Sequence, residues 1–314
     1  HLWFAVANLA MWFNSKNQVT TVVQVFSFTD PRSVELIKRL NKLAESKAVT
    51  VVGVVVPNYE FEKSKLWQKK QAERFGVRFS LLGLTDEGLE IRLGVGVGLI
   101  NTWDPGVYGL DQTGKIKWQT DPEHGKMALR GEFSDLFGGG NIGGKIIYKI
   151  TPRLEAGYWQ GKIGNQPDNF FSDSDISFLL PNQTEGERLY WNGFWNWGGE
   201  GMEHIGEVAG GIHYLLAQYD GGRVWFVGGR EDGKTTAVEV ELDGRPIPKD
   251  WAGADLRYDE HGRSWLWIAG PALYQITNGS VYHKGKIKIK VGEAGLTIYA
   301  LDFGGVAQYE ANLS

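Results

Sequence analysis

The residues with the most recognisable chemistry form a short aromatic run, Tyr190-Trp191-Asn192-Gly193-Phe194-Trp195-Asn196-Trp197. Sugar rings stack on flat aromatic faces, and neighbouring amide side chains can form hydrogen bonds with sugar hydroxyls. Tyr190, Trp191, Trp195 and Trp197 are therefore candidate glycan-binding residues. Side chains alternate between the two faces of a strand, so one set must point inward. The two sets are Trp191, Trp195 and Trp197 on one face, and Tyr190, Phe194 and Asn196 on the other.

A second aromatic pair has a different pattern. Trp265 and Trp267 alternate with Leu266 and Ile268, so this strand is apolar on both faces. Such a strand either lies in the middle of a sheet or carries a binding surface.

Metal ligands are not grouped in this sequence. The six histidines lack companions at the spacings typical of zinc or copper sites; they are His1, His124, His204, His213, His261 and His283. His1 could bind copper through its amine only if it is the true N-terminus and other histidines lie close in space. Acidic turns could hold a structural Ca²⁺, although plain turn carboxylates are the simpler interpretation. These turns are Asp220-Gly221, Asp243-Gly244, and Asp255 with Asp259. We otherwise predict no metal or cofactor.

Carboxylate pairs of the kind that hydrolyse glycosidic bonds do not stand out, because nothing singles out one acid and one base. We predict that the protein is not an enzyme; a deep cleft with paired carboxylates would instead indicate an enzyme of another kind, which is the third alternative. Three N-glycosylation sequons begin at Asn182, Asn278 and Asn312. They matter only if the chain is extracellular and its host glycosylates.

Composition indicates the fold class and excludes several kinds of partner and reaction. The 314 residues include 43 Gly and 13 Trp, a bias typical of β-rich proteins with many tight turns. The net charge is −4, so the chain lacks the excess of positive charge that is typical of nucleic-acid-binding proteins. No run reaches the roughly 18 apolar residues that a transmembrane span needs. The chain has no cysteine, which excludes disulfides, thiol nucleophiles and thiolate metal sites.

Residues 14–150 are predicted to form an α/β domain. Strands are expected at 19–28, 49–56, 77–84, 108–111 and 116–118. Asp30-Pro31 predicts the start of a helix, because Asp is a favoured N-cap and Pro a favoured first helical residue. A second, basic helix is expected at 64–75. This order of elements is the thioredoxin pattern.

Residues 151–314 are predicted to form an all-β sandwich, because short strands alternate with turns. Val238, Val240 and Leu242 alternate with glutamates, and Ile287, Ile289 and Val291 alternate with lysines. Both patterns predict strands with one buried and one solvent-facing side.

The first domain resembles the thioredoxin-like domain of DipZ-type proteins, which are associated with cytochrome c biogenesis. The shared residues are Trp12-Phe13-Asn14-Ser15, Phe28-Thr29, Pro57 with Tyr59-Glu60-Phe61-Glu62-Lys63, Trp103 near Pro105, and Tyr108-Gly109-Leu110-Asp111 with the Gly114 turn. The resemblance continues through Thr151-Pro152, Gly157-Tyr158, Gly193-x-Trp195, Leu242-Asp243-Gly244-x-Pro246, Leu273-Tyr274 and Tyr299-Ala300-x-Asp302-Phe303-Gly304. It implies a thioredoxin-like domain followed by a jelly-roll β-sandwich similar to carbohydrate-binding modules.

The chain departs from that family at its redox motif. There a Cys-x-x-Cys follows the Thr, and Pro105 falls where the fold places its cis-proline. The four positions here are Asp30-Pro31-Arg32-Ser33. A helix-capping carboxylate thus replaces a nucleophilic thiolate, and Ser33 cannot resolve a mixed disulfide. The resemblance therefore implies a redox-inactive thioredoxin-like domain.

The favoured interpretation is an extracytoplasmic binding or structural protein, extracellular or at the cell surface, whose β-sandwich recognises a glycan. The alternative is a self-assembling extracellular filament or cell-surface subunit. Its basis is the apolar segment 1–13, which could add a strand to a neighbouring copy, together with the Gly-rich stretch 138–144.

Overall fold

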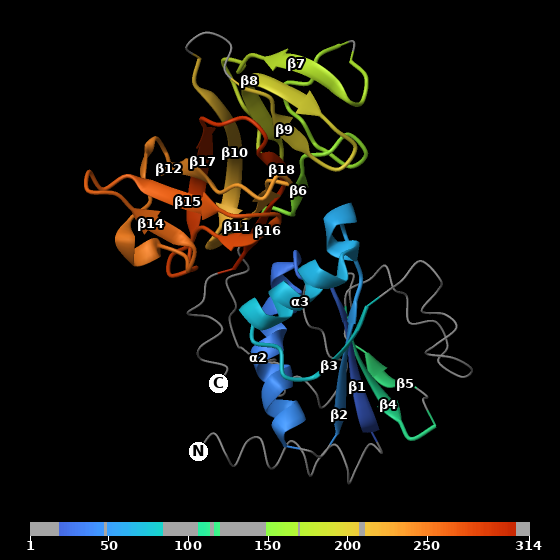
Figure 1. Cartoon of the computed structure of the whole chain (residues 1–314). Coiled ribbons are helices and arrows are strands. Elements are labelled where there is room, and N and C mark those ends of the chain that lie inside the picture. The colour runs from blue at the N-terminus through green and yellow to red at the C-terminus, as the bar shows by residue number, and fades with distance from the viewer. Residues whose placement is uncertain are drawn as a thin grey trace. The chain divides into compact units, whose positions relative to one another are not determined.

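The computed structural model describes residues 19–46, 49–83, 106–113, 116–119, 149–168, 170–206 and 211–305 (Figure 1). Apart from the last two residues, the chain divides into two compact units, His1–Gly144 and Lys145–Asn312. The predictions made for the segment 1–13, Pro105, the stretch 138–144 and Asn312 fall outside the described residues.

In the described part of the first unit, five strands form one mixed sheet in the order β3-β2-β1-β4-β5. The strands are β1 (Val19–Phe26), β2 (Thr50–Val55), β3 (Ser80–Gly83), β4 (Gly106–Asp111) and β5 (Ile116–Gln119). The first three run parallel, whereas β4 is antiparallel to β1 and β5 to β4. The helices are α2 (Pro31–Glu45) and α3 (Lys65–Arg74). The expected order of strands and helices is confirmed.

Both helices pack on one face of this sheet, as Figure 1 shows. Phe26 of β1 lies in one hydrophobic cluster with Ile37 of α2 and Trp67 of α3. Val23 and Val25, which alternate with Phe26, belong to a separate cluster on the other side of the sheet. The strand is therefore buried on both faces, as its continuous β-branched run predicted.

In the described part of the second unit, thirteen strands join into one large antiparallel sheet. They are β6 (Leu154–Glu155), β7 (Ser174–Phe178), β8 (Leu189–Trp197), β9 (Met202–His204), β10 (His213–Gly221), β11 (Arg223–Gly229), β12 (Thr236–Leu242), β13 (Arg245–Pro246), β14 (Leu256–Tyr258), β15 (Ser264–Ile268), β16 (Ala272–Gln275), β17 (His283–Val291) and β18 (Thr297–Gly304). The main order is β14-β15-β12-β17-β10-β8-β9-β18-β11-β16 (Figure 1).

Strand β8 joins the two halves of this sheet. Its first half pairs with β10, and its second half pairs with β7 and β9. Gly193 lies between the halves with a φ of +101°, and a side chain there would collide with the His213 ring. Leu215 and Ile289 from one half share a single core with Phe226 from the other. The arrangement is sandwich-like, with one hydrophobic core between the two halves.

No helix in the described part of the chain is long and apolar enough to cross a membrane.

Candidate functional site

Asp30 lies where the family resemblance places the first redox cysteine. Its Oδ1 accepts a hydrogen bond from the Arg32 backbone N at 3.3 Å, and its Oδ2 accepts one from the Ser33 hydroxyl at 2.5 Å. The Asp30 side chain is only 6% exposed. The predicted N-cap is confirmed, and the carboxylate is committed to holding the start of α2.

Glu62 forms a second buried polar group beside the ends of β1 and β2. It lies in the 3₁₀-helix Glu60–Lys63 and is fully buried. Ser27 Oγ is hydrogen-bonded to Glu62 Oε2 at 2.6 Å, and Thr29 Oγ1 is hydrogen-bonded to Glu62 Oε1 at 2.7 Å. The backbone N of Asn58 donates to Oε1 at 3.3 Å. Sequence reasoning gave Glu62 no role of its own, because its partners lie about 30 residues away in the chain.

The aromatic run at 190–197 forms β8, and its rings lie in the interior. Trp191 and Trp195 are fully buried, and Trp197 and Tyr190 are 2% and 3% exposed. Alternation directs the three tryptophans into the core, whereas Tyr190 is covered by close contact with Gly164. These four residues cannot offer a ring face to a sugar, so the prediction of a glycan platform at this strand is wrong.

The acidic turns use their carboxylates within the chain. Asp243 Oδ2 pairs with His283 Nε2 at 2.8 Å, and its Oδ1 accepts from the backbone N of Lys286 at 2.8 Å. Asp220 Oδ1 lies 3.8 Å from Lys284 Nζ. Among the described residues, no three His, Asp or Glu side chains are grouped as metal ligands. This geometry favours turn carboxylates over a calcium site.

Two of the three sequons can be located. Asn182 is exposed. Asn278 Nδ2 donates to Asp250 O at 2.8 Å, and its Oδ1 accepts from the backbone N of Ser280 at 2.8 Å. Attachment of a glycan to Asn278 would replace one of its two Nδ2 hydrogens and leave one for a hydrogen bond. Glycosylation of either residue stays a prediction.

A row of polar and aromatic side chains crosses the outer face of the second unit's sheet. Five adjacent strands contribute one residue each in register: Arg257 (β14), Trp265 (β15), Glu239 (β12), Lys290 (β17) and Tyr214 (β10). The residues between them along β12 and β17 are buried in the core, which confirms the predicted alternation. We call this row, together with the adjacent pairs Trp267–Ala237 and Glu241–Lys288, the ladder face.

Ion pairs hold the charged side chains of the ladder face in place. Lys290 Nζ lies 2.5 Å from Glu241 Oε1 and 3.4 Å from Glu239 Oε2. Burial opposes the charge on Lys290, but the hydrogen bonds and charges of these two glutamates raise the pKa of its ammonium group. Lys288 Nζ lies 5.1 Å from the centre of the Tyr214 ring, and burial raises the pKa of that tyrosine. The face therefore presents fixed donors and acceptors.

The two tryptophans of β15 differ in how they are held. Trp265 Nε1 donates to Asp259 Oδ2 at 3.2 Å, and the Arg263 guanidinium lies 5.4 Å from the Trp265 ring centre. Trp267 is 60% exposed, and its neighbour across the strands is the small Ala237. The sequence indicated a central strand or a binding surface. The strand lies next to the edge strand β14 and leaves most of the Trp267 indole open to solvent.

Asp259 binds the side chains of both Arg263 and Trp265. Burial disfavours its charge, but three hydrogen bonds outweigh that effect and lower the pKa of Asp259 to about 2. These three donors are the backbone N of Arg263 at 2.9 Å, Arg263 Nε at 2.7 Å and Trp265 Nε1 at 3.2 Å, and the backbone N of His261 also donates to Asp259 Oδ1 at 3.0 Å. The carboxylate is therefore charged at neutral pH and holds Trp265 in position.

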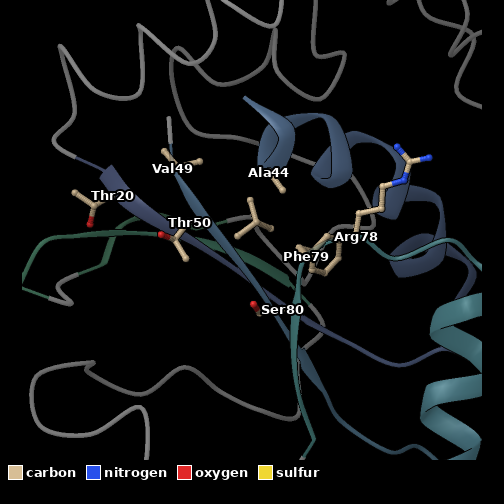
Figure 2. Close-up of a pocket in the computed structure, with 8 residues that line it drawn as sticks. Thr20, Ala44, Val49, Thr50, Arg78, Phe79 and Ser80 are labelled. Carbon is tan, nitrogen blue, oxygen red and sulfur yellow. The ribbon is translucent and has the colours of Figure 1, made fainter. Parts of the chain in front are cut away.

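The first unit contains a cavity of about 420 Å³ beside the ends of its parallel strands. Figure 2 shows its lining, which comes from α2 and from the segments around β1, β2 and β3. The polar side chains are Thr20, Thr50, Ser80 and Arg78, and Arg78 Nη1 is bound to Glu45 Oε1 at 2.6 Å. The described lining contains no carboxylate or histidine, so it offers no group for general acid–base catalysis at neutral pH.

Residues 156–304 match the family model described as the thioredoxin-like C-terminal domain. The match covers most of the second unit and supports the thioredoxin-like part of the resemblance. No curated protein matches this chain.

Solved structures give only distant likenesses. The catalytic domain of a GH87 alpha-1,3-glucanase matches with a TM-score of 0.21 and 15% identity, over 34% of this chain and 22% of its own. A two-domain esterase active on acetylated mannans matches with a TM-score of 0.30 and 10% identity, over 96% of this chain and 77% of its own. An exo-beta-1,3-galactanase from Phanerochaete chrysosporium matches with a TM-score of 0.23 and 13% identity, over 62% and 36%. This chain spans about a fifth of the length of the glucanase structure. At these TM-scores the likenesses carry no argument about activity.

Proposed function

We propose that this chain is a redox-inactive, non-enzymatic binding protein whose second unit holds a carbohydrate on the ladder face. The observation that carries the proposal is Trp267. Its indole is 60% exposed on an ordered strand, beside the small Ala237 and next to a row of fixed charges. Trp267 and the partly buried Trp265 lie on the same side of β15, so together they form an aromatic surface of the kind that marks a ligand site.

The chemistry of the ladder face suits a pyranose. Such a sugar has one apolar face of C–H groups that packs on an indole, and hydroxyls that need donors and acceptors. Trp267 and Trp265 are two residues apart on β15, which separates them by about 7 Å along the strand. A chain of sugars stacked on Trp267 would therefore pass over Arg257 and Glu239, whose charged groups can bind its hydroxyls.

The first unit fits the proposal as a thioredoxin-like domain of the DipZ type without its redox chemistry. The chain has no cysteine, and Asp30 caps the helix where the thiolate would stand. The location outside the cytoplasm rests on the family resemblance. Self-assembly stays a prediction, because the segment 1–13 on which it depends lies outside the described residues.

Retention on polysaccharides tests the proposal. The intact chain, Trp267→Ala and the control Leu179→Ala are incubated with insoluble cellulose and chitin and with soluble xylan and mannan. Leu179 is 81% exposed and lies outside the ladder face. We expect Trp267→Ala to weaken binding about tenfold, as loss of one stacking contact should, and Leu179→Ala to bind like the intact chain. If none of these polymers retains the intact chain, the proposal is wrong.

A further inference from the structure

Trp159 is a second exposed tryptophan, and it lies away from the ladder face. Its side chain is 72% exposed, yet its backbone is held by the turn between β8 and β9. The backbone N of Trp159 donates to Gly199 O at 3.2 Å, and the backbone N of Tyr158 donates to Gly198 O at 3.0 Å. The exposed indole therefore stands on an ordered turn.

Two glycines allow the two turns to interlock. A Cβ on Gly199 would lie 2.6–2.9 Å from three carbons of the Trp159 indole, so the ring rests directly against this glycine. A Cβ on Gly157 would collide with the backbone of Gly199 and Glu200. Any larger residue at either position would force the turns apart. The indole is thus fixed from one side while most of it stays open to solvent.

The residues beneath the turn attach it to the core. The Tyr158 ring lies edge-on to Trp197 at 5.6 Å and to Phe170 at 5.5 Å, and Phe170 stacks on Trp197 at 4.5 Å. Trp197 is 2% exposed and donates from Nε1 to Ala156 O at 2.9 Å. The position of Trp159 is therefore set before any ligand arrives, which lowers the entropy cost of binding.

We propose that Trp159 is a second sugar-stacking platform, so that one chain engages a polysaccharide at two places. The inference rests on the proposed function and extends it. The turn places polar groups around the ring: Gln160 is exposed, and the backbone of Glu200 adjoins the turn. A single fixed ring among polar groups suits one pyranose, whereas a stable protein interface buries about 800 Å² on each partner around an apolar centre.

Two platforms predict a difference between long and short ligands. A polymer can occupy both platforms, so its affinity should exceed that of a short oligosaccharide through the raised effective concentration of the second contact. A hexasaccharide should instead bind each platform separately, with two molecules per chain.

The test compares Trp159→Ala, Trp267→Ala and the double variant, with Leu179→Ala as control and Trp159→Tyr as the variant that retains a stacking ring. Binding of the retained polymer is measured by depletion, and that of its hexasaccharide by calorimetry. Circular dichroism verifies that each variant is folded. We expect each single Ala variant to bind the polymer about tenfold more weakly and one hexasaccharide per chain. Trp159→Tyr should keep most of the affinity and both sites.

The outcomes separate the two proposals. If Trp159→Ala binds like the intact chain and the intact chain takes one hexasaccharide, the inference is wrong while the ladder face stands. If Trp159→Ala loses binding and Trp267→Ala does not, the Trp159 platform stands and the ladder face is wrong. If the intact chain binds none of the four polymers, both are wrong.

Discussion

The Glu62 carboxyl group and the hydroxyls of Ser27 and Thr29 form a closed ring of hydrogen bonds, which needs one hydrogen for each contact. We therefore expect Glu62 to tolerate replacement by glutamine but not by alanine. The oxygen–oxygen contacts joining Ser27, Thr29 and the Glu62 carboxyl group measure 2.6, 2.7 and 2.8 Å. Each contact of this length requires one hydrogen. The two hydroxyls supply two, so we infer that the third sits on the carboxyl group, which then donates to one of the hydroxyls.

Glutamine can complete the same ring with its amide. Its nitrogen can donate to Ser27, Ser27 to Thr29, and Thr29 to the amide oxygen, which still accepts from the backbone N of Asn58. We therefore expect Glu62→Gln to cost less than about 1 kcal/mol. Glu62→Ala removes three hydrogen bonds at about 1 kcal/mol each and leaves a cavity, so it should cost at least about 3 kcal/mol.

Hydrogen exchange of the β1 amides measures the stability of the first unit by itself. The control is Glu60→Gln, because Glu60 belongs to the same 3₁₀-helix but its exposed carboxylate pairs with Lys63 at 2.7 Å. The control should change stability by less than about 0.5 kcal/mol. An ionised Glu62 would instead accept two charge-assisted bonds, and glutamine would lose one, at about 2 kcal/mol. A loss of that size in Glu62→Gln would refute the hydrogen count.

Three further predictions concern the helix N-cap at Asp30, the titration of Asp259 and the backbone conformation of Gly193. Asp30→Ala should lower the stability of the first unit by about 1 kcal/mol in denaturant unfolding, because α2 loses its N-cap, and an unchanged midpoint would contradict the cap. The pKa of Asp259 falls from about 4 in the unfolded chain to about 2 in the fold. The contribution of Asp259 to stability is therefore complete above about pH 4 and is lost as the pH falls toward 2. The NMR signal of the Trp265 indole N–H should shift between these pH values. A titration midpoint of this signal at pH 4 or above would contradict the lowered pKa. Gly193→Ala should destabilise the second unit by at least about 2 kcal/mol in thermal unfolding, because φ is +101° and the new methyl group meets His213; a loss below about 0.5 kcal/mol would exclude a strained bend.

Local patterns account for what could be predicted from the sequence. Asp30-Pro31 predicted the start of α2, because capping depends on residues within one helical turn. Alternation along β12 predicted which of its sides is buried. The same alternation could not show that Tyr190 is covered, since the covering contact comes from Gly164, 26 residues earlier. The glycan platform was therefore placed on the most aromatic strand, which is the core of the second unit.

The two platforms differ in the signal they leave in the sequence. Trp267 stands in the run Trp265-Leu266-Trp267-Ile268, which is apolar on both faces, so the pattern itself indicated either a central strand or a binding surface. Trp159 stands in a turn, and its position depends on Gly199, 40 residues later. A contact between two turns this far apart has no local signature, so only the structure reveals it.

The helix start at Asp30 shows how the first unit holds the N-terminus of α2 without a cysteine. The N-terminus of α2 needs an acceptor for its free backbone N–H groups, and it favours negative charge through the helix dipole. A thiolate meets the electrostatic part of this requirement, and an aspartate meets both parts, since Asp30 also binds the Arg32 backbone N and the Ser33 hydroxyl. An Asp at this position therefore caps α2 and supplies no thiolate nucleophile.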